Sequence, residues 1–196
     1  MTSRRVLPIV EGHGDAAALP TLIRRIAQEQ GIYDLKILRP HVRGDYPKLG
    51  ARLQDYLLAA HEEGAPALWV LDYDCKACNN VERDLEDLRR KSQALAPQLM
   101  IRFAFIVKEY ESLFLTNEAA TRKVLKHIPA EITFPDEPEG IRGAKEWLSK
   151  ALPKGLAYKE TIHQEKISAH LDLPLLRQRS PSFQRLEQAL IDLIKN

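Results

Sequence analysis

The sequence predicts an α/β fold: a mainly parallel sheet flanked by helices, with a C-terminal helical extension. Three observations lead to this class. Short apolar runs alternate with longer segments of helical periodicity through the first half of the chain. The connections between them are short, which favours parallel strands joined by right-handed crossovers. Strand-like runs then stop near residue 112, and helical segments follow.

The first half of the chain contains the expected strands. They are residues 6–10, 35–38, 67–71 and 100–107, each a short apolar run. The run at 67–71, ALWVL, is apolar at every position, as is typical of a central strand covered on both faces. Apolar residues at helical spacing predict helices over residues 15–30, 48–63 and 81–95. The stretch HVRGDYP before the second of these helices is expected to be a polar loop.

The second half is expected to be helical. The predicted helices cover residues 118–126, 144–152, 161–170 and 182–194. Before the last of them, Ser180 is expected to be the N-cap and Phe183 a core contact. We therefore predict an α/β core of residues 1–116 and a helical extension of residues 117–196 packed on it.

Composition sets wider limits on function. The chain is 44% hydrophobic and 29% charged, and its net charge of +2 neither demands nor excludes nucleic acid. No apolar run approaches the roughly 18 residues that span a bilayer, and the N-terminus lacks the apolar region of a secretory signal. We expect a cytoplasmic protein without membrane association; the sequence leaves both a monomer and a homodimer open.

The two cysteines, Cys75 and Cys78, form a CxxC motif. A zinc site would need two further ligands at compatible spacing, and a redox pair would want a thioredoxin-like helix start. We expect two reduced, unspecialised thiols, with metal or redox use as the alternatives.

Acidic side chains follow three of the predicted strands and open the first predicted helix. They are Glu11, Asp15, Asp72, Asp74, Glu109 and Glu111. Because the carboxyl ends of parallel strands lie on one edge of a sheet, we expect these side chains to converge there. Residues two apart in an extended segment point the same way, so Asp72 and Asp74 are expected to face one site together.

Crowded carboxylates repel one another and raise each other's pKa values unless a cation lies among them. Oxygen ligands of this kind favour Mg²⁺ or Mn²⁺ over zinc. Such ions bind phosphate oxygens and stabilise the charge that develops in phosphoryl transfer. The pattern therefore favours phosphodiester hydrolysis, with nucleic acid as the substrate.

The segment between Glu11 and Asp15 supplies three candidate phosphate contacts. Gly12 and Gly14 permit a tight turn and expose backbone N–H groups at a helix start, where anions bind readily. His13 lies between them and is placed with them as a substrate contact; a loop histidine without a catalytic role is the alternative.

The acidic motifs resemble those of the Toprim domain shared by topoisomerases, primases and several nucleases. IVEGHGD and KEYESLFL are similar to motifs of the overcoming-lysogenization-defect (OLD) nucleases, in which a second acid stands four positions after the first glutamate, here Asp15. The chain also resembles a small bacterial Toprim-like family of unknown function, with VEGxGD, DxDC, KExES and a C-terminal RSPSFQRL.

The resemblance implies a Toprim-like, Rossmann-like core in which Glu11, Asp15, Asp72, Asp74 and either Glu109 or Glu111 hold one or two Mg²⁺ ions. It also implies a nuclease with catalytic roles for Glu11, Asp72 and Asp74. The chain lacks the GxxxxGK[ST] motif of the ATPase that OLD-type nucleases carry in the same chain. A separate ATPase partner, and a setting in phage defence, are therefore expected by analogy.

Basic residues of the expected extension are candidates to complete the site. We expect two of them to take part in catalysis, Lys145 and Lys159. We expect three others to bind nucleic acid, because Lys and Arg neutralise phosphates: Lys166, Arg177 and Arg179. For each of them the alternative is a solvated basic helix face.

The leading hypothesis is thus a Mg²⁺-dependent Toprim-like nuclease acting on DNA or RNA. Two other readings stay open. One is a non-catalytic, metal-binding Toprim-like subunit of an ATPase complex, and the other is a small-molecule phosphohydrolase that uses the same metal chemistry.

Overall fold

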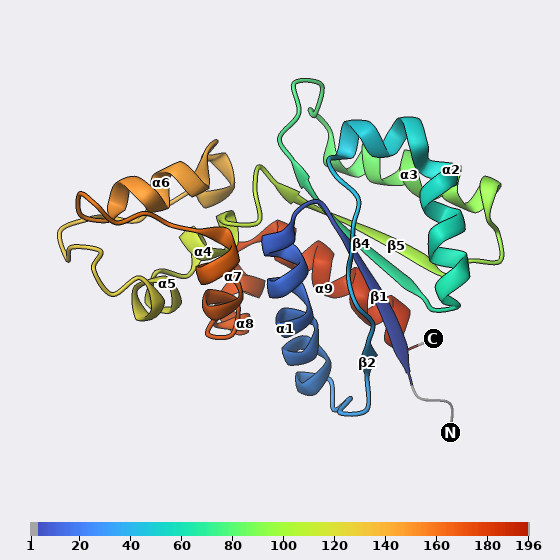
Figure 1. Cartoon of the computed structure of the whole chain (residues 1–196), viewed down its shortest axis with the longest axis horizontal. Helices are drawn as coiled ribbons and strands as arrows, with labels where there is room; N and C mark the ends of the chain where they lie inside the picture. The colour runs from blue at the N-terminus through green and yellow to red at the C-terminus, as the bar shows by residue number, and fades with distance from the viewer. Residues whose placement is uncertain (1–3, 196) are drawn as a thin grey trace.

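A five-stranded parallel sheet forms the centre of the molecule (Figure 1). The computed structural model describes residues 4–195, apart from the side chains of residues 50 and 51. The strands are β1 (Arg5–Val10), β2 (Lys36–Ile37), β3 (His41–Val42), β4 (Ala67–Tyr73) and β5 (Ile101–Val107). Their order is β2-β1-β4-β5, and β3 also pairs with β1. The predicted α/β class, with a parallel sheet flanked by helices, is confirmed.

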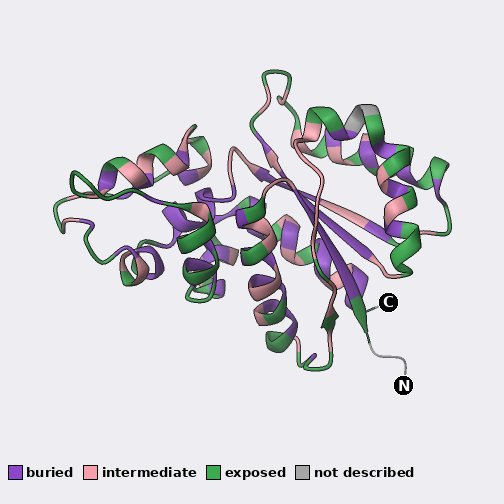
Figure 2. Ribbon diagram, viewed as in Figure 1, coloured by how far each residue is buried: buried purple, intermediate pink, exposed green. Residues whose placement is uncertain are grey.

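The two faces of the sheet bury different cores, because successive residues of a strand point to opposite faces. In β4, Leu68 and Val70 belong to the core under α1 (His13–Glu29) and α9 (Pro181–Ile194). Trp69 belongs to the core on the other face, under α2 (Tyr46–Glu63) and α3 (Val81–Leu95). Figure 2 shows the central strands buried along most of their length. This double cover explains why ALWVL is apolar at every position.

The helices between β5 and α9 gather on the side of α1 away from α2 and α3 (Figure 1). They are α4 (Ser112–Thr116), α5 (Glu118–Val124), α6 (Ala144–Ala151), α7 (Glu160–Ser168) and α8 (Leu173–Arg179), with a 3₁₀ turn at Pro138–Gly140. α7 packs along α1, and the guanidinium of Arg25 in α1 donates to the carbonyl oxygens of Ser168 (2.8 Å) and Leu171 (2.5 Å) at the end of α7. A cation at a helix C-terminus is favoured by the exposed carbonyl groups there.

The last helix, α9, returns to the sheet. It packs against β5, β4 and β1, and the backbone N–H of Val107 at the end of β5 donates to Ser182 Oγ (2.9 Å). Ser180 caps the helix by accepting from the N–H of Phe183 (3.1 Å), and Phe183 is buried, so both predicted roles are confirmed. Residues on both sides of position 116 share one core. The predicted boundary between core and extension stays a prediction.

Several elements differ from the sequence-based expectation. The stretch expected as a polar loop contains β3, which places Val42 beside Val10 of β1, and the backbone N–H of Arg43 donates to the carbonyl of Val10 (2.9 Å). A two-residue strand is too short to show a period of two. The helices α4 and α8 were also not expected, and β2 is shorter than predicted.

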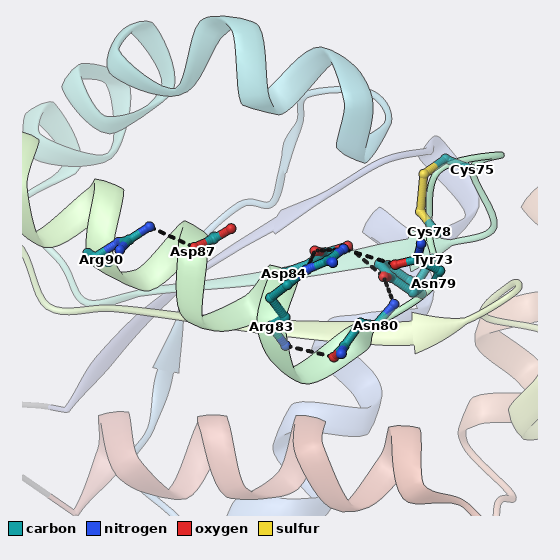
Figure 3. Close-up of polar contacts among 9 residues, drawn as sticks. All are labelled: Tyr73, Cys75, Cys78, Asn79, Asn80, Arg83, Asp84, Asp87 and Arg90. Carbon is teal, nitrogen blue, oxygen red and sulfur yellow. Dashed lines mark hydrogen bonds and ion pairs between the residues drawn. A yellow bond between two sulfur atoms is a disulfide. The ribbon is translucent and has the colours of Figure 1, made fainter.

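The loop between β4 and α3 holds a disulfide between Cys75 and Cys78, with an S–S distance of 2.09 Å (Figure 3). The expectation of two reduced thiols is therefore wrong. The chain turns back on itself here, with the N–H of Cys78 donating to the carbonyl of Cys75 (3.1 Å), and this turn brings the two Cα atoms within 5.1 Å. Such a turn is not visible in the spacing of the cysteines alone.

The same loop is fixed at its base by a polar network (Figure 3). Tyr73 O–H donates to Asp84 Oδ2 (2.6 Å) and accepts from the backbone N–H of Asn80 (3.0 Å).

Among the described helices, none is long and apolar enough to cross a membrane.

Candidate functional site

The carboxyl edge of the sheet holds a chain of linked carboxylates. Glu11 follows β1, and its Oε1 accepts from the backbone N–H of Asp72 in β4 (3.1 Å). Asp72 Oδ1 in turn accepts from the backbone N–H of Tyr110, just after β5 (3.0 Å). Glu11 thus binds the backbone of β4, and Asp72 binds the backbone just after β5. This parallel arrangement brings Glu11 and Asp72 to one place, as the sequence predicted.

Asp15 joins this group from the first turn of α1. Its Oδ2 accepts from the backbone N–H of Gly12 (3.1 Å), and its Oδ1 accepts from Gln164 Nε2 in α7 (2.6 Å). One oxygen therefore caps α1, and the other ties α1 to the C-terminal helices.

The two glycines of the first motif make contacts within the protein, and their expected phosphate contact stays a prediction. The N–H of Gly12 is taken by Asp15. Gly14 is buried under α7, where an added Cβ atom would lie 2.0 Å from Gln164 Oε1 and 2.8 Å from Glu160 Cβ. The close approach of α7 thus explains why position 14 has no side chain.

Of the two glutamates after β5, Glu111 is the one that faces the other acids. It is fully buried, and its Oε1 accepts from Tyr158 O–H (2.9 Å). Its Oε2 is buried without a hydrogen-bond partner among the described residues. Glu109 instead accepts from the backbone N–H of Lys145 (3.1 Å) at the start of α6, which is a helix-capping contact.

Lys145 supplies a positive charge beside the acids. Its Nζ pairs with Glu160 Oε1 at 2.7 Å, and its charge partly opposes the rise in pKa that burial causes at Asp72 and Glu111. Burial alone would lower the pKa of Lys145, but the carboxylates of Glu111 and Glu160 raise it above its ordinary value. The predicted proximity of this lysine to the carboxylates is therefore present in the structure.

Burial and mutual repulsion raise the pKa values of the clustered acids. The pKa of Glu11 rises to about 8 through burial and then through the charges of Asp15 and Asp45. Burial raises the pKa of Asp72 well above its ordinary value, with the charges of Asp15 and Glu11 adding to the effect. Burial likewise raises the pKa of Glu111 to about 8 and that of Asp15. A cation among these groups would relieve both causes.

The chemistry of these donors suits a hard divalent cation. The cluster offers carboxylate oxygens, and both Glu111 Oε2 and Gln164 Oε1 are buried without a hydrogen-bond partner in the described part of the chain. Within residues 4–195, however, no group of three or more His, Cys, Asp or Glu side chains is arranged to hold an ion as it stands. An ion would therefore bind only after these side chains rearrange.

Asp74 does not lie with Asp72. β4 ends at Tyr73, so the alternation that would aim both aspartates at one site stops before Asp74. Asp74 is exposed, and its backbone carbonyl accepts from the guanidinium of Arg142.

The other basic candidates are exposed or bind other residues. Lys159 and Lys166 are exposed at the start and towards the end of α7. Arg177 pairs with Glu29 (2.5 Å), the last residue of α1, and with Glu187 (2.7 Å), so it lies at the end of α1 opposite to Asp15. Arg179 is exposed and donates to the carbonyl of Asp136 (3.2 Å). His13 is also exposed at the first turn of α1.

The structure adds three residues that the sequence analysis missed: Gln164, Tyr158 and Glu160. Each binds one of the predicted residues, namely Asp15, Glu111 and Lys145. They come from α7 and the segment just before it, and no motif in that segment marks them. Gly14 was the available signal in the sequence, because a glycine can indicate that another segment packs closely against it. It did not indicate which segment this would be.

Comparison with known proteins gives a family and solved structures of low similarity. The family described as "Domain of unknown function (DUF4276)" matches residues 10–191. The C-terminal region of the Burkholderia pseudomallei OLD protein is similar with a TM-score of 0.49 and 11% identity, covering 97% of this chain and 100% of that one. The corresponding region from Xanthomonas campestris pv. campestris has a TM-score of 0.45 and 13% identity, covering 97% of each chain. Values this low do not identify a function. A search of curated proteins found no match.

Proposed function

Because the chain belongs to the DUF4276 family, described as a domain of unknown function, we propose its activity from the site itself. We propose a divalent-metal-dependent, Toprim-like nuclease that hydrolyses phosphodiester bonds of DNA or RNA. One observation carries the proposal: acids from three strand ends, Glu11, Asp72 and Glu111, act electrostatically on one another together with Asp15. Buried carboxylates placed this close together repel one another, and this repulsion costs free energy unless a cation lies among them.

Glu11, Asp15, Asp72 and Glu111 are the residues that would hold Mg²⁺ or Mn²⁺. Such an ion activates a water molecule and stabilises charge on phosphate oxygens. Lys145 would exchange its partner Glu160 for a phosphate oxygen of the substrate, because its ammonium group already lies within reach of the acids' charges. Burial of the site strengthens each of these interactions by excluding water.

A second candidate is a metal-binding subunit without catalytic activity. It is favoured by the present engagement of both Asp15 oxygens and by the lack of a preformed three-ligand arrangement within the described residues. In either case we extend the proposal to a separate ATPase partner and to phage defence. This extension is supported by the resemblance of the acidic motifs to those of OLD nucleases.

Calorimetric titration of Mg²⁺ and Mn²⁺ into the full chain tests the metal site. The informative variant is Asp72→Asn, which keeps an oxygen to accept from Tyr110 N–H and removes the charge. Asp74→Asn is the matched control, since it makes the same change at an exposed position two residues away. We expect the wild type and the control to bind metal and Asp72→Asn to lose binding. Equal binding by all three proteins would contradict the assigned ligands.

Cleavage assays then separate the two candidates. The wild type and Asp74→Asn are expected to cut labelled DNA or RNA oligonucleotides in the presence of Mn²⁺ or Mg²⁺, and Asp72→Asn is expected not to. Metal binding without cleavage of any oligonucleotide, with copurifying ATPase supplied, would favour the non-catalytic subunit.

A further inference from the structure

A groove with a volume of about 710 Å³ lies beside the N-terminus of α1. One side is formed by the first turns of α1 and the other by the segment around β3, with the end of α2 closing it. The lining residues are His13, Ala16, Ala17, Arg39, Pro40, His41, Val42, Arg43 and Glu63. By helical periodicity His13, Ala16 and Ala17 occupy a different face of α1 from Gly14 and Asp15, which contact α7.

Positive charge is in excess in this groove. Arg39 is exposed, and no ion-pair partner for it lies among residues 4–195. Arg43 donates to His41 Nδ1 at 3.2 Å, and His41 Nε2 lies 3.0 Å from Glu63 Oε1. Because a guanidinium group only donates, His41 Nδ1 accepts and Nε2 carries the proton that binds Glu63. Glu63 is the one carboxylate among these lining residues, and it keeps its charge when a neutral imidazole binds it, so the two arginines leave the groove with a net positive charge.

The groove adjoins the carboxylate cluster through the backbone. The N–H of Arg43 donates to the carbonyl of Val10 (2.9 Å), the residue immediately before Glu11. A few residues further along the same segment, the charge of Asp45 and the backbone N–H of Tyr46 both act on Glu11. The segment from Arg39 to Tyr46 thus borders the groove at one end and the acidic site at the other.

A cluster of carboxylates does not by itself attract a polyanion, and a net charge of +2 adds little. A nuclease of this kind needs cations close to the acids but separate from them. We propose that the groove lined by Arg39, Arg43, His41 and His13 binds the phosphate backbone of the nucleic-acid strand that is cleaved at the neighbouring carboxylates. The ligand is a phosphodiester chain recognised through its charge, so binding is independent of base sequence. The inference rests on the proposed nuclease function for the place of cleavage.

Fluorescence anisotropy with labelled single-stranded DNA and RNA of the same sequence tests the groove. The measurements use the full chain in EDTA, so that metal binding does not contribute, and are repeated over a range of salt concentrations. The test variant is Arg39→Ala with Arg43→Ala. The control is Arg89→Ala with Arg90→Ala, which removes the same charge from exposed positions on α3.

The test variant is expected to bind about tenfold or more weakly than the wild type. Its plot of log affinity against log salt should lose a slope of about 0.7 for each phosphate contact removed. The control should match the wild type. Arg39→Lys with Arg43→Lys should retain most of the affinity, which separates a loss of charge from a loss of folding. The ratio of DNA to RNA affinity shows which strand the groove prefers.

The result distinguishes failure of this inference from failure of the proposed function. Wild-type cleavage combined with unchanged affinity and salt slope in Arg39→Ala with Arg43→Ala would overturn the groove and leave the nuclease in place. Salt-dependent binding that the double variant loses, without cleavage by the wild type, would support the groove and contradict the nuclease. Failure of the wild type to bind either strand would overturn the groove.

Discussion

At the scale of single residues, the acids at the sheet edge hold the backbone together as well as supplying candidate ligands. Glu11 accepts from the N–H of Asp72, and Asp72 accepts from the N–H of Tyr110. Removing either side chain entirely would leave a partly buried N–H donor unsatisfied, at a cost of up to about 1–3 kcal/mol. For this reason an amide, which keeps an acceptor oxygen, is the better replacement than alanine for separating function from folding.

Replacement of Gly14 by alanine is expected to destabilise the protein by about 1–3 kcal/mol through overpacking. The added Cβ would lie 2.0 Å from Gln164 Oε1 and 2.8 Å from Glu160 Cβ, and because Glu160 Cβ is fixed to the backbone, α7 would have to move away from α1. The control is Gly12→Ala, whose Cβ would be 3.4 Å from Asp15 Oδ2, an ordinary contact. Urea unfolding of the two variants measures the difference. Equal stabilities would show that α7 does not press against position 14.

Glu111 is expected to make stability depend on pH when divalent ions are removed. Burial raises its pKa from 4.5 to about 8, so the folded state binds this proton more tightly than the unfolded state. The contribution of the group is fully present below pH 4.5 and is lost as the pH rises towards 8. The loss is on the order of a few kcal/mol.

Urea unfolding in EDTA, from about pH 5 to about pH 8, measures this dependence. Glu111→Gln keeps an oxygen to accept from Tyr158 and removes the titration, so its stability should vary less with pH than that of the wild type. Parallel pH profiles for the two proteins would contradict the assignment.

At the scale of the elements, each motif is placed by the end of a strand or helix. β1 and β4 pair in parallel with Ile9 beside Trp69, and this register brings the residues that follow to the same edge. α7 then closes the site from the other side, through Gln164 on Asp15 and Glu160 on Lys145. The strands thus supply the acids, and the C-terminal helices supply the lysine and the cover.

The loop between β4 and α3 yields a prediction about the cysteines. The chain has two cysteines, and the structure joins them, so freshly purified, unreduced protein should show no titratable thiol and two after reduction under denaturing conditions. The expectation of a cytoplasmic location makes the measurement informative, because a reducing compartment would oppose this bond. Replacement of both cysteines by serine should cost about 2 kcal/mol or less in urea unfolding, because the loop closed by the bond is short. Two free thiols in the unreduced protein would contradict the bond.

At the scale of the whole molecule, one core joins the first and last parts of the chain. Leu19 and Leu22 of α1 share it with Phe183 and Leu186 of α9. α9 also covers β5, β4 and β1. Of the helices after residue 116, α9 is therefore needed to bury one face of the sheet.

A fragment of residues 1–116 is expected not to fold by itself, because it lacks α9 and exposes the apolar residues beneath it. Circular dichroism and urea unfolding of this fragment should show no cooperative transition, whereas the full chain should unfold cooperatively. As a control, a peptide with the sequence of α9 is added to the fragment. A cooperative transition that returns with the peptide would show that the fragment lacks only the helix that covers its sheet. A fragment that unfolds cooperatively by itself would instead establish residues 1–116 as an independent domain.

The sequence by itself determined the alternation of strands and helices and the edge at which the acids meet. These follow from local signals: apolar runs such as ALWVL, the N-cap of α9 at Ser180, and carboxylates placed directly after strands. Glu11 and Asp72 were predictable in this way because the parallel sheet leaves their strand ends only one common edge.

Tertiary structure alone decided which acid pairs with which neighbour. Asp74 falls outside the site because β4 ends one residue too early, and Glu111 enters it while Glu109 caps α6. Gln164 reaches Asp15 across 149 positions of sequence, a contact that no local pattern encodes. Such contacts depend on how α7 packs on α1, and that packing is set by the shape of the whole core.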